Sequence, residues 1–243
     1  MTFLDLHAPA LRPVEGFYTS QVETPRPWPV RTFLPVGYEP RYPYPLLVWF
    51  HGHGGNEEHM LRLAPRLSRR NFICISLRGP ICVGQRPHGL GWSWGDGAHA
   101  SLVEDYLLRA VEQTRRRHHV HSERIYLAGS GEGAAMAYRL GLTFPEKLAA
   151  VVSLNGALPR VNRPLLRLPQ VRSLRVFIGH GIANSVVPLS LARADQRLLH
   201  AAGLDVEMHT YPTTHKLHPD MLRDLNRWVI GHCNAEVDRL VQM

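Results

Sequence analysis

The chain has 243 residues, of which 44% are hydrophobic and 20% are charged. These values suit one large α/β domain with a sizeable core, and they exclude a disordered or fibrous chain. No stretch approaches the roughly 18 apolar residues of a membrane helix, and the first residues lack the basic and apolar segments of a secretory signal. The cysteines are few, scattered and odd in number, so a cytoplasmic location is expected.

The formal net charge is +8 and comes mostly from arginine. The densest basic run, residues 115–119, lies at the end of a predicted helix, where cations suit the helix dipole. No groove-reading motif accompanies it, so nucleic acid is not an expected partner. The histidine groups that stand close in the sequence lack a third ligand at zinc spacing, and no metal or cofactor is expected.

Residues 1–27 are rich in proline and are predicted to form an irregular arm, followed by one domain over 28–231 and a tail over 232–243. Strands are predicted at 27–34, 46–50, 72–77, 125–128, 148–154, 174–178 and 206–211. The prolines of the first strand favour an edge position. Helices are predicted at 56–69, with Asn56 as N-cap, and at 99–117, 134–142, 188–202 and 219–230.

Two long connections stand out between these elements. Residues 79–97 form a loop rich in glycine and tryptophan, and residues 157–173 form an excursion rich in proline and arginine that could cap a pocket. The arginines of this excursion are Arg160, Arg163, Arg167 and Arg172. They could contact an anionic ligand, although solvated arginine side chains are the simpler interpretation. Because strands and helices alternate, the chain predicts an open, mostly parallel sheet with helices on both faces.

The segment 124–137 combines a short apolar strand, a glycine-rich turn and a helix. This is the frame of the nucleophile elbow, G-x-S-x-G. Here the frame is filled as Gly129-Ser130-Gly131-Glu132-Gly133, so the position of the nucleophile holds glycine.

This segment and four others that follow strands together resemble the α/β-hydrolase fold, in its phospholipase/carboxylesterase branch with feruloyl-esterase relatives. The others are 51–56, 78–96, 180–188 and 211–218, and residues 34–40 followed by 45–52 are similar to the opening of those esterases. The resemblance implies an oxyanion hole made by the main-chain N–H groups of His53 and Glu132. It also implies a pocket wall of Trp92, Trp94 and Asp96, for which loop-anchoring aromatics are an equal alternative.

The resemblance places the acid of the catalytic triad on Asn184 and the general base on His215. Gly131 supplies no attacking oxygen. The amide NH₂ of Asn184 is expected to favour the wrong imidazole tautomer of His215. These departures imply an inactive or severely impaired hydrolase that still binds a small acyl, ester, carboxylate or other anionic ligand.

Three alternatives stay open. An active ester hydrolase could use a shifted nucleophile, Ser130, with His215, and a shifted acid could be Asp195 or Asp205. A dinucleotide-binding protein is also conceivable, because Gly129, Gly131 and Ala134 satisfy G-x-G-x-x-G/A, although no acidic residue ends the next strand. A homodimer is compatible with the sequence.

Overall fold

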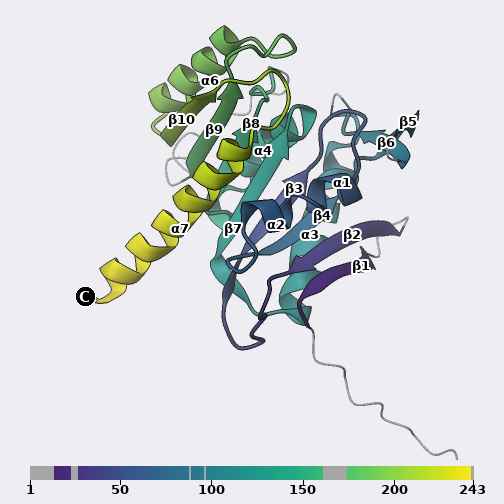
Figure 1. The fold of residues 1–243 in the computed structure, drawn as a ribbon, viewed down its shortest axis with the longest axis vertical. Helices are drawn as coiled ribbons and strands as arrows, with labels where there is room; N and C mark the ends of the chain where they lie inside the picture. The colour runs from purple at the N-terminus through teal and green to yellow at the C-terminus, as the bar shows by residue number, and fades with distance from the viewer. Residues whose placement is uncertain (1–13, 23–26, 88, 96, 161–173, 242–243) are drawn as a thin grey trace, which may run out of the picture.

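A computed structural model describes residues 14–22, 27–87, 89–95, 97–160 and 174–241, with side chains described as far as residue 235. The chain is built around an eight-stranded sheet (Figure 1). In chain order its strands are β1 (Gly16–Val22), β2 (Trp28–Leu34), β3 (Tyr44–Phe50), β4 (Ile73–Leu77), β7 (Val120–Ser130), β8 (Ala150–Leu154), β9 (Arg175–Gly181) and β10 (Asp205–Tyr211).

The spatial order of the strands is β1-β2-β4-β3-β7-β8-β9-β10. The first two pairings, β1 with β2 and β2 with β4, are antiparallel, and all pairings from β4 to β10 are parallel. The central strands β3 and β4 are buried along their whole length, as expected when helices cover both faces of a parallel sheet. The mostly parallel sheet predicted from the alternation of elements is confirmed.

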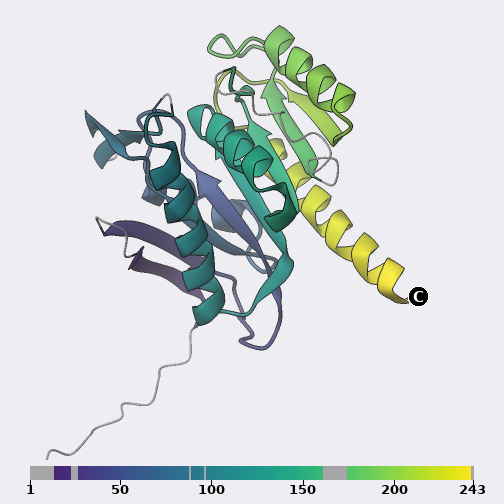
Figure 2. The same cartoon turned by 180° about the vertical axis from the view of Figure 1, so that it is seen from behind.

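Helices cover both faces of the sheet (Figures 1 and 2). Those on one face are α1 (Glu57–Leu61), α2 (Ala64–Leu67) and α7 (Pro219–Val241), and those on the other are α3 (Ala100–Arg117), α4 (Glu132–Thr143) and α6 (Leu189–Ala201). A short 3-10 turn, η1 (Pro145–Lys147), links α4 to β8. Each helical layer buries its own apolar cluster against the sheet, so the core has two halves.

Two strand regions differ from the sequence prediction. Residues 16–22, inside the predicted irregular arm, form β1 and pair with β2 along its length. The edge strand is therefore β1, and Pro29 is tolerated in β2 because the pairing with β4 starts at Val30. The predicted loop 79–97 contains an antiparallel hairpin of β5 (Ile81–Arg86) and β6 (Gly89–Ser93).

Two helical regions also differ from the prediction. The predicted helix 56–69 is divided into α1 and α2, because Pro65 lies in the first turn of α2 and cannot continue a preceding helix. The Asn56 cap is confirmed, since its side chain accepts the N–H of His59 at 2.8 Å. The last helix, α7, runs to Val241 and includes Gly231, so most of the predicted tail is helical.

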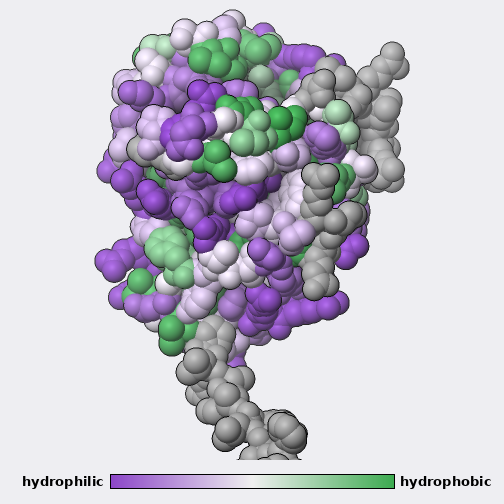
Figure 3. Space-filling view, turned by 90° about the vertical axis from the view of Figure 1, so that its right-hand side faces the viewer, coloured by the Kyte–Doolittle hydropathy of each residue, from purple (hydrophilic) through white to green (hydrophobic). Residues whose placement is uncertain are grey.

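One side of the molecule carries apolar side chains in small groups. Figure 3 shows these as separate green areas among hydrophilic ones on the side of the molecule that bears β1, β2 and the hairpin. Within the described ranges, no helix is long and apolar enough to cross a membrane. The predicted excursion 157–173 lies outside the described residues from 161 onward, and with it Arg163, Arg167 and Arg172.

Candidate functional site

The turn between β7 and α4 has the geometry of a nucleophile elbow with glycine at its tip. Strand β7 ends at Ser130 and helix α4 begins at Glu132, so Gly131 makes the turn. Its backbone has φ 56° and ψ −117°, a conformation that L side chains rarely adopt. Its N–H donates to the carbonyl of Leu154 at the end of β8 (3.0 Å), and its carbonyl accepts from Ala134 (3.1 Å).

The glycines on either side of the tip are fixed by close packing. A Cβ built on Gly129 would lie 2.1 Å from the carbonyl oxygen of Gly133, and a Cβ on Gly133 would lie 2.2 Å from that of Phe50. Backbone atoms cannot give way at such distances. An elbow centred one residue earlier would require Ala128 and Glu132 to play these roles, so the packing favours Gly131 as the centre.

Ser130, the alternative nucleophile, is the last residue of β7 and stands in register with Leu154 of β8. A Cβ built on Gly131 would lie 3.0 Å from Nε2 of His215. The geometry therefore puts a side chain at position 131 beside the imidazole, which favours Gly131 as the nucleophile position.

His215 and Asn184 lie together, as the resemblance implies. Nδ1 of His215 lies 3.1 Å from Oδ1 of Asn184. The same Oδ1 accepts the main-chain N–H groups of Val186 (3.1 Å) and Val187 (3.0 Å). These two donors fix which end of the amide faces the imidazole, because only the oxygen can accept them.

The expectation that Asn184 favours the wrong tautomer of His215 is therefore not met. With Oδ1 as its neighbour, Nδ1 of His215 carries the proton, and the lone pair of Nε2 faces Gly131. Asn184 thus orients the imidazole as an aspartate would, but it supplies no negative charge to stabilise an imidazolium. Sequence reasoning could not see this orientation, because it depends on the backbone of Val186 and Val187.

His215 is held in its neutral form. Burial lowers the pKa of His215 below the ordinary value, and the nearby His180 lowers it further. His180 is the penultimate residue of β9 and is itself fully buried, with Nε2 donating to the carbonyl of Val187 (2.9 Å). Nδ2 of Asn184 lies 3.5 Å from that Nε2. The site therefore contains a second buried histidine that the sequence analysis did not single out.

The turn that follows β3 lies against the elbow. A Cβ on Gly52 would lie 3.2 Å from the carbonyl oxygen of Ser130. Nδ1 of His53 lies 3.5 Å from Oε2 of Glu132, so the two residues assigned to the oxyanion hole are neighbours. Glu132 is the first residue of α4, where main-chain N–H groups have no partner within the helix.

His51 holds this turn in place. Its Nε2 accepts the N–H of Gly79 (2.9 Å), so Nδ1 carries the proton and donates to the carbonyl of Gly52 (2.8 Å). Burial lowers the pKa of His51, so this neutral tautomer persists. The ring therefore ties the turn that follows β3 to the segment after β4.

The aromatic residues of segment 92–96 anchor a loop. Trp94 is only 1% exposed, and its Nε1 donates to the carbonyl of His51 (2.8 Å). This supports the anchoring alternative for Trp94 and not the pocket wall. Trp92 is half-buried, with the guanidinium of Arg78 stacked on its ring at 4.8 Å. Asp96 lies outside the described residues.

The side chain of Glu132 joins this loop to the elbow. Its Oε1 accepts the hydroxyl of Ser93 (2.6 Å) and the N–H of Gly95 (3.1 Å). These bonds fix the loop beside the N-terminus of α4. The Trp92–Asp96 motif thus positions the elbow through Ser93 and Gly95, a role the sequence reasoning missed.

Asn155, at the end of β8, positions both loops that carry the triad positions. Its Oδ1 accepts the N–H of Gly181 (2.8 Å), and its Nδ2 donates to the carbonyl of Lys216 (2.9 Å). Asn155 is fully buried and has φ 55°, within the left-handed region. The sequence offered a signal here, since asparagine tolerates that region better than most residues.

Neither alternative acid faces His215. Asp195 is buried on α6 and accepts the N–H of Leu158 (2.7 Å) and the guanidinium of Arg160. Burial raises the pKa of Asp195, and Leu158, Arg160 and His180 counteract that rise. Asp205 starts β10 and lies 3.7 Å from Arg175, at the opposite end of the strands from the elbow.

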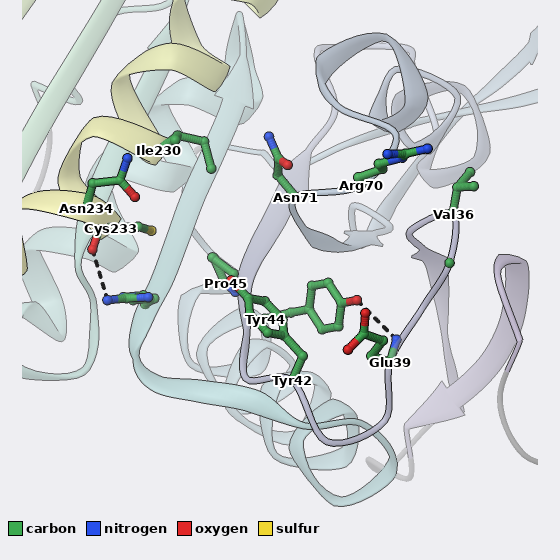
Figure 4. A pocket seen from close by; sticks show the side chains of 12 residues that line it. Val36, Glu39, Tyr42, Tyr44, Pro45, Arg70, Asn71, Ile230, Cys233 and Asn234 are labelled. Carbon is green, nitrogen blue, oxygen red and sulfur yellow. Dashed lines mark hydrogen bonds between the residues drawn. The ribbon is translucent and has the colours of Figure 1, made fainter. Parts of the chain in front are cut away.

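A cavity of about 480 Å³ also lies at that opposite end (Figure 4). Tyr44 and Pro45 from the start of β3 line one side, and Ile230 and Cys233 of α7 line another. Parallel α/β sheets bind ligands beyond the carboxyl ends of their strands, so this cavity is not part of the candidate site. Within the described side chains, no three His, Cys, Asp or Glu residues group as metal ligands.

The sheet, its two helical layers and the elbow define the α/β-hydrolase fold. A family model described as Phospholipase/Carboxylesterase matches residues 39–232. The chain belongs to this phospholipase/carboxylesterase family. The resemblance inferred from the sequence motifs is thereby confirmed, and the match gives no support to the dinucleotide-binding alternative.

Known relatives carry esterase and thioesterase names. The chain is 39% identical over 114 residues to acyl-protein thioesterase 1 of Mycosarcoma maydis, covering 44% of this chain and 48% of the relative. It is 23% identical over 205 residues to a probable carboxylesterase of Oryza sativa subsp. japonica, covering 76% and 87%. The chain thus spans about half the length of the first of these relatives.

Solved structures show the same fold. A carboxylesterase from Mesorhizobium loti superposes with a TM-score of 0.70 at 20% identity, covering 88% of this chain and 99% of that one. At this level of identity, the likeness concerns the fold.

Proposed function

We propose that the turn after β3, residues 51–55, acts as an oxyanion turn. This chain binds a small acyl ligand (an ester, thioester or carboxylate) there and does not form an acyl-enzyme. The observation that carries the proposal is the backbone of Gly131, which has elbow geometry and faces Nε2 of His215. An acyl-enzyme needs an oxygen or sulfur nucleophile at that point. The names of the relatives support acyl compounds as the ligand class.

The donors for such a ligand are main-chain groups. They do not depend on the serine and aspartate that the chain lacks, so ligand binding can outlast the loss of acyl transfer. A cytoplasmic location belongs to the same proposal. It is supported by the free thiols of Cys74 and Cys82, because reducing compartments keep thiols unpaired.

Labelling with a fluorophosphonate, read by intact mass and peptide mapping, tests the proposal. The wild-type protein is expected to gain no adduct. The double variant Gly131→Ser with Asn184→Asp is expected to gain one adduct at position 131, because the substitutions restore the nucleophile and the charged acid. Adding Ser130→Ala to the double variant is the matched control and should leave the labelling unchanged.

Two results would contradict the proposal. An adduct on Ser130 of the wild-type protein would identify a working serine hydrolase with a shifted nucleophile. Failure of the folded double variant to react would show that the oxyanion turn and His215 do not form a competent site around position 131.

A further inference from the structure

We propose that water takes the place of the missing serine hydroxyl, so that the chain hydrolyses activated esters in one step with His215 as general base. This inference rests on the proposed function, since the ester must bind with its carbonyl at the oxyanion turn. It adds a reaction to that binding, without a covalent intermediate.

The position beside Gly131 suits a water molecule. Apart from its chain neighbours, the described atoms within 4 Å of a Cβ built there both belong to the His215 ring: Nε2 at 3.0 Å and Cε1 at 3.4 Å. A water oxygen further from the Gly131 Cα, on the side where a serine hydroxyl would point, could approach Nε2 to hydrogen-bond distance. A serine side chain would extend into this space, and glycine leaves the space free of side-chain atoms.

His215 has the tautomer and the orientation of a general base. Nδ1 of His215 donates to the side-chain Oδ1 of Asn184, with 3.1 Å between the two atoms, so the lone pair of Nε2 faces the proposed water. Burial and the neighbouring His180 lower the pKa of His215, which keeps the ring unprotonated at neutral pH. A serine is not required for this part of the mechanism.

The carbonyl of the ester is activated from the other side of the elbow. Glu132 begins α4, a helix of 12 residues, so its N–H lies at the positive end of the helix dipole. Oε1 of its carboxylate is held by Ser93 and Gly95, and Oε2 lies 3.5 Å from Nδ1 of His53, so the carboxylate is fixed by side-chain and loop partners and not by its own N–H. The N–H groups of His53 and Glu132 can therefore receive the negative charge that develops on the carbonyl oxygen.

The reaction balances with water as the sole co-reactant. His215 Nε2 takes one proton from water as the water oxygen forms a bond to the carbonyl carbon. The tetrahedral oxyanion then collapses, the bond from the carbonyl carbon to the leaving oxygen breaks, and the proton on Nε2 passes to that oxygen. The products are a carboxylic acid and an alcohol or phenol, and the protein returns unchanged.

Steady-state and rapid-quench kinetics with 4-nitrophenyl acetate test this proposal. The wild-type chain should exceed the buffer rate without a burst and without an acetyl adduct in the quenched protein. His215→Ala should lower kcat/KM at least tenfold, since a general base contributes about 10²–10⁴-fold. Gly131→Ala should do the same, because its methyl group would lie 3.0 Å from Nε2 and obstruct the approach of water while His215 remains.

Asn184→Asp and an exposed histidine provide the controls. The carboxylate should stabilise the imidazolium formed in the reaction, so Asn184→Asp should raise kcat/KM. His209, an exposed residue of β10 that pairs with Glu207, reports on unspecific hydrolysis by surface imidazoles. His209→Ala should leave the rate unchanged. Circular dichroism checks that each variant is folded. If Gly131→Ala is not folded, His215→Gln serves as the second test variant and should also lower kcat/KM, because glutamine cannot act as the general base.

Binding of phenylphosphonate, followed by ligand-observed NMR, separates the two proposals. Binding without hydrolysis above the buffer rate would overturn the reaction and leave the proposed function standing. Loss of both would overturn the proposed function. Hydrolysis that survives His215→Ala, or an acetyl adduct on the protein, would overturn the water mechanism.

Discussion

Gly131 holds a backbone conformation that costs other residues about 1–3 kcal/mol. A serine in the same place would bear that strain as well as the short approach of its Cβ to the imidazole, 3.0 Å. Glycine at the tip therefore adopts this backbone conformation without strain, but it offers no nucleophilic side chain.

Gly131→Ala should lower the free energy of unfolding by about 1–3 kcal/mol, measured by urea denaturation. The matched control is Gly231→Ala in α7. A Cβ there meets no atom within 4 Å, and alanine is the better helix former, so unfolding should cost about 0.5–1 kcal/mol more. Equal stability of the two variants would show that the tip of the elbow is not strained.

Some of the site could be predicted from the sequence and some could not. The elbow frame, the oxyanion turn and His215 lie in short local motifs, and the structure brings these residues together. The orientation of the Asn184 amide depends on N–H groups two and three residues away. The bridging role of Asn155 depends on two loops distant in sequence, so no local pattern reveals it.

At the scale of elements, helix α1 directly follows the turn after β3 and packs against the sheet. Two neighbouring carboxylates on it make contrasting ion pairs. Glu57 is buried, with 1% of its side chain exposed, and binds Arg78 through two hydrogen bonds. Glu58 is half-exposed and pairs with Arg31.

Glu57→Ala should destabilise the fold by about 1–3 kcal/mol, because it removes the partner of a largely covered guanidinium. Glu58→Ala, one residue away, should cost less than about 1 kcal/mol, since solvent screens an exposed pair. Chemical denaturation at neutral pH measures both. Equal decreases in the free energy of unfolding would mean that the burial of Glu57 does not strengthen its ion pair.

The strands that could be predicted from the sequence are rich in apolar residues, whereas the strands that were not predicted are exposed or rich in glycine. Continuous apolar runs such as 46–50 and 72–77 predicted buried strands close to those observed. Strand β1 is largely exposed and polar, and the β5–β6 hairpin contains three glycines, so neither has a hydrophobic period. Their pairing with neighbouring strands, rather than local preference, makes them strands.

At the scale of the whole molecule, several histidines are held neutral. Burial lowers the pKa of His51, His118, His180 and His215 from 6.5. The unfolded chain binds protons at these residues near pH 6.5, whereas the folded chain binds them only at lower pH. Their contribution to stability is therefore complete above pH 6.5 and is lost as the pH falls below it.

The melting temperature should thus be lower at about pH 5.5 than at about pH 7.5. Repeating the measurement in high salt provides a control, because salt screens the general repulsion of a chain of net charge +8 but does not remove the desolvation of buried imidazoles. A melting temperature that rises on acidification would contradict the assignment of these histidines as neutral in the folded protein.

Asn155 has an evolutionary consequence. The loops that bear Asn184 and His215 are joined by its side chain, and the elbow is held by Gly129 and Gly133. None of these supports involves the reacting side chains. Mutations at the nucleophile and acid positions could therefore accumulate without loss of the scaffold, and a lineage could abandon acyl transfer and later regain it by changing two positions.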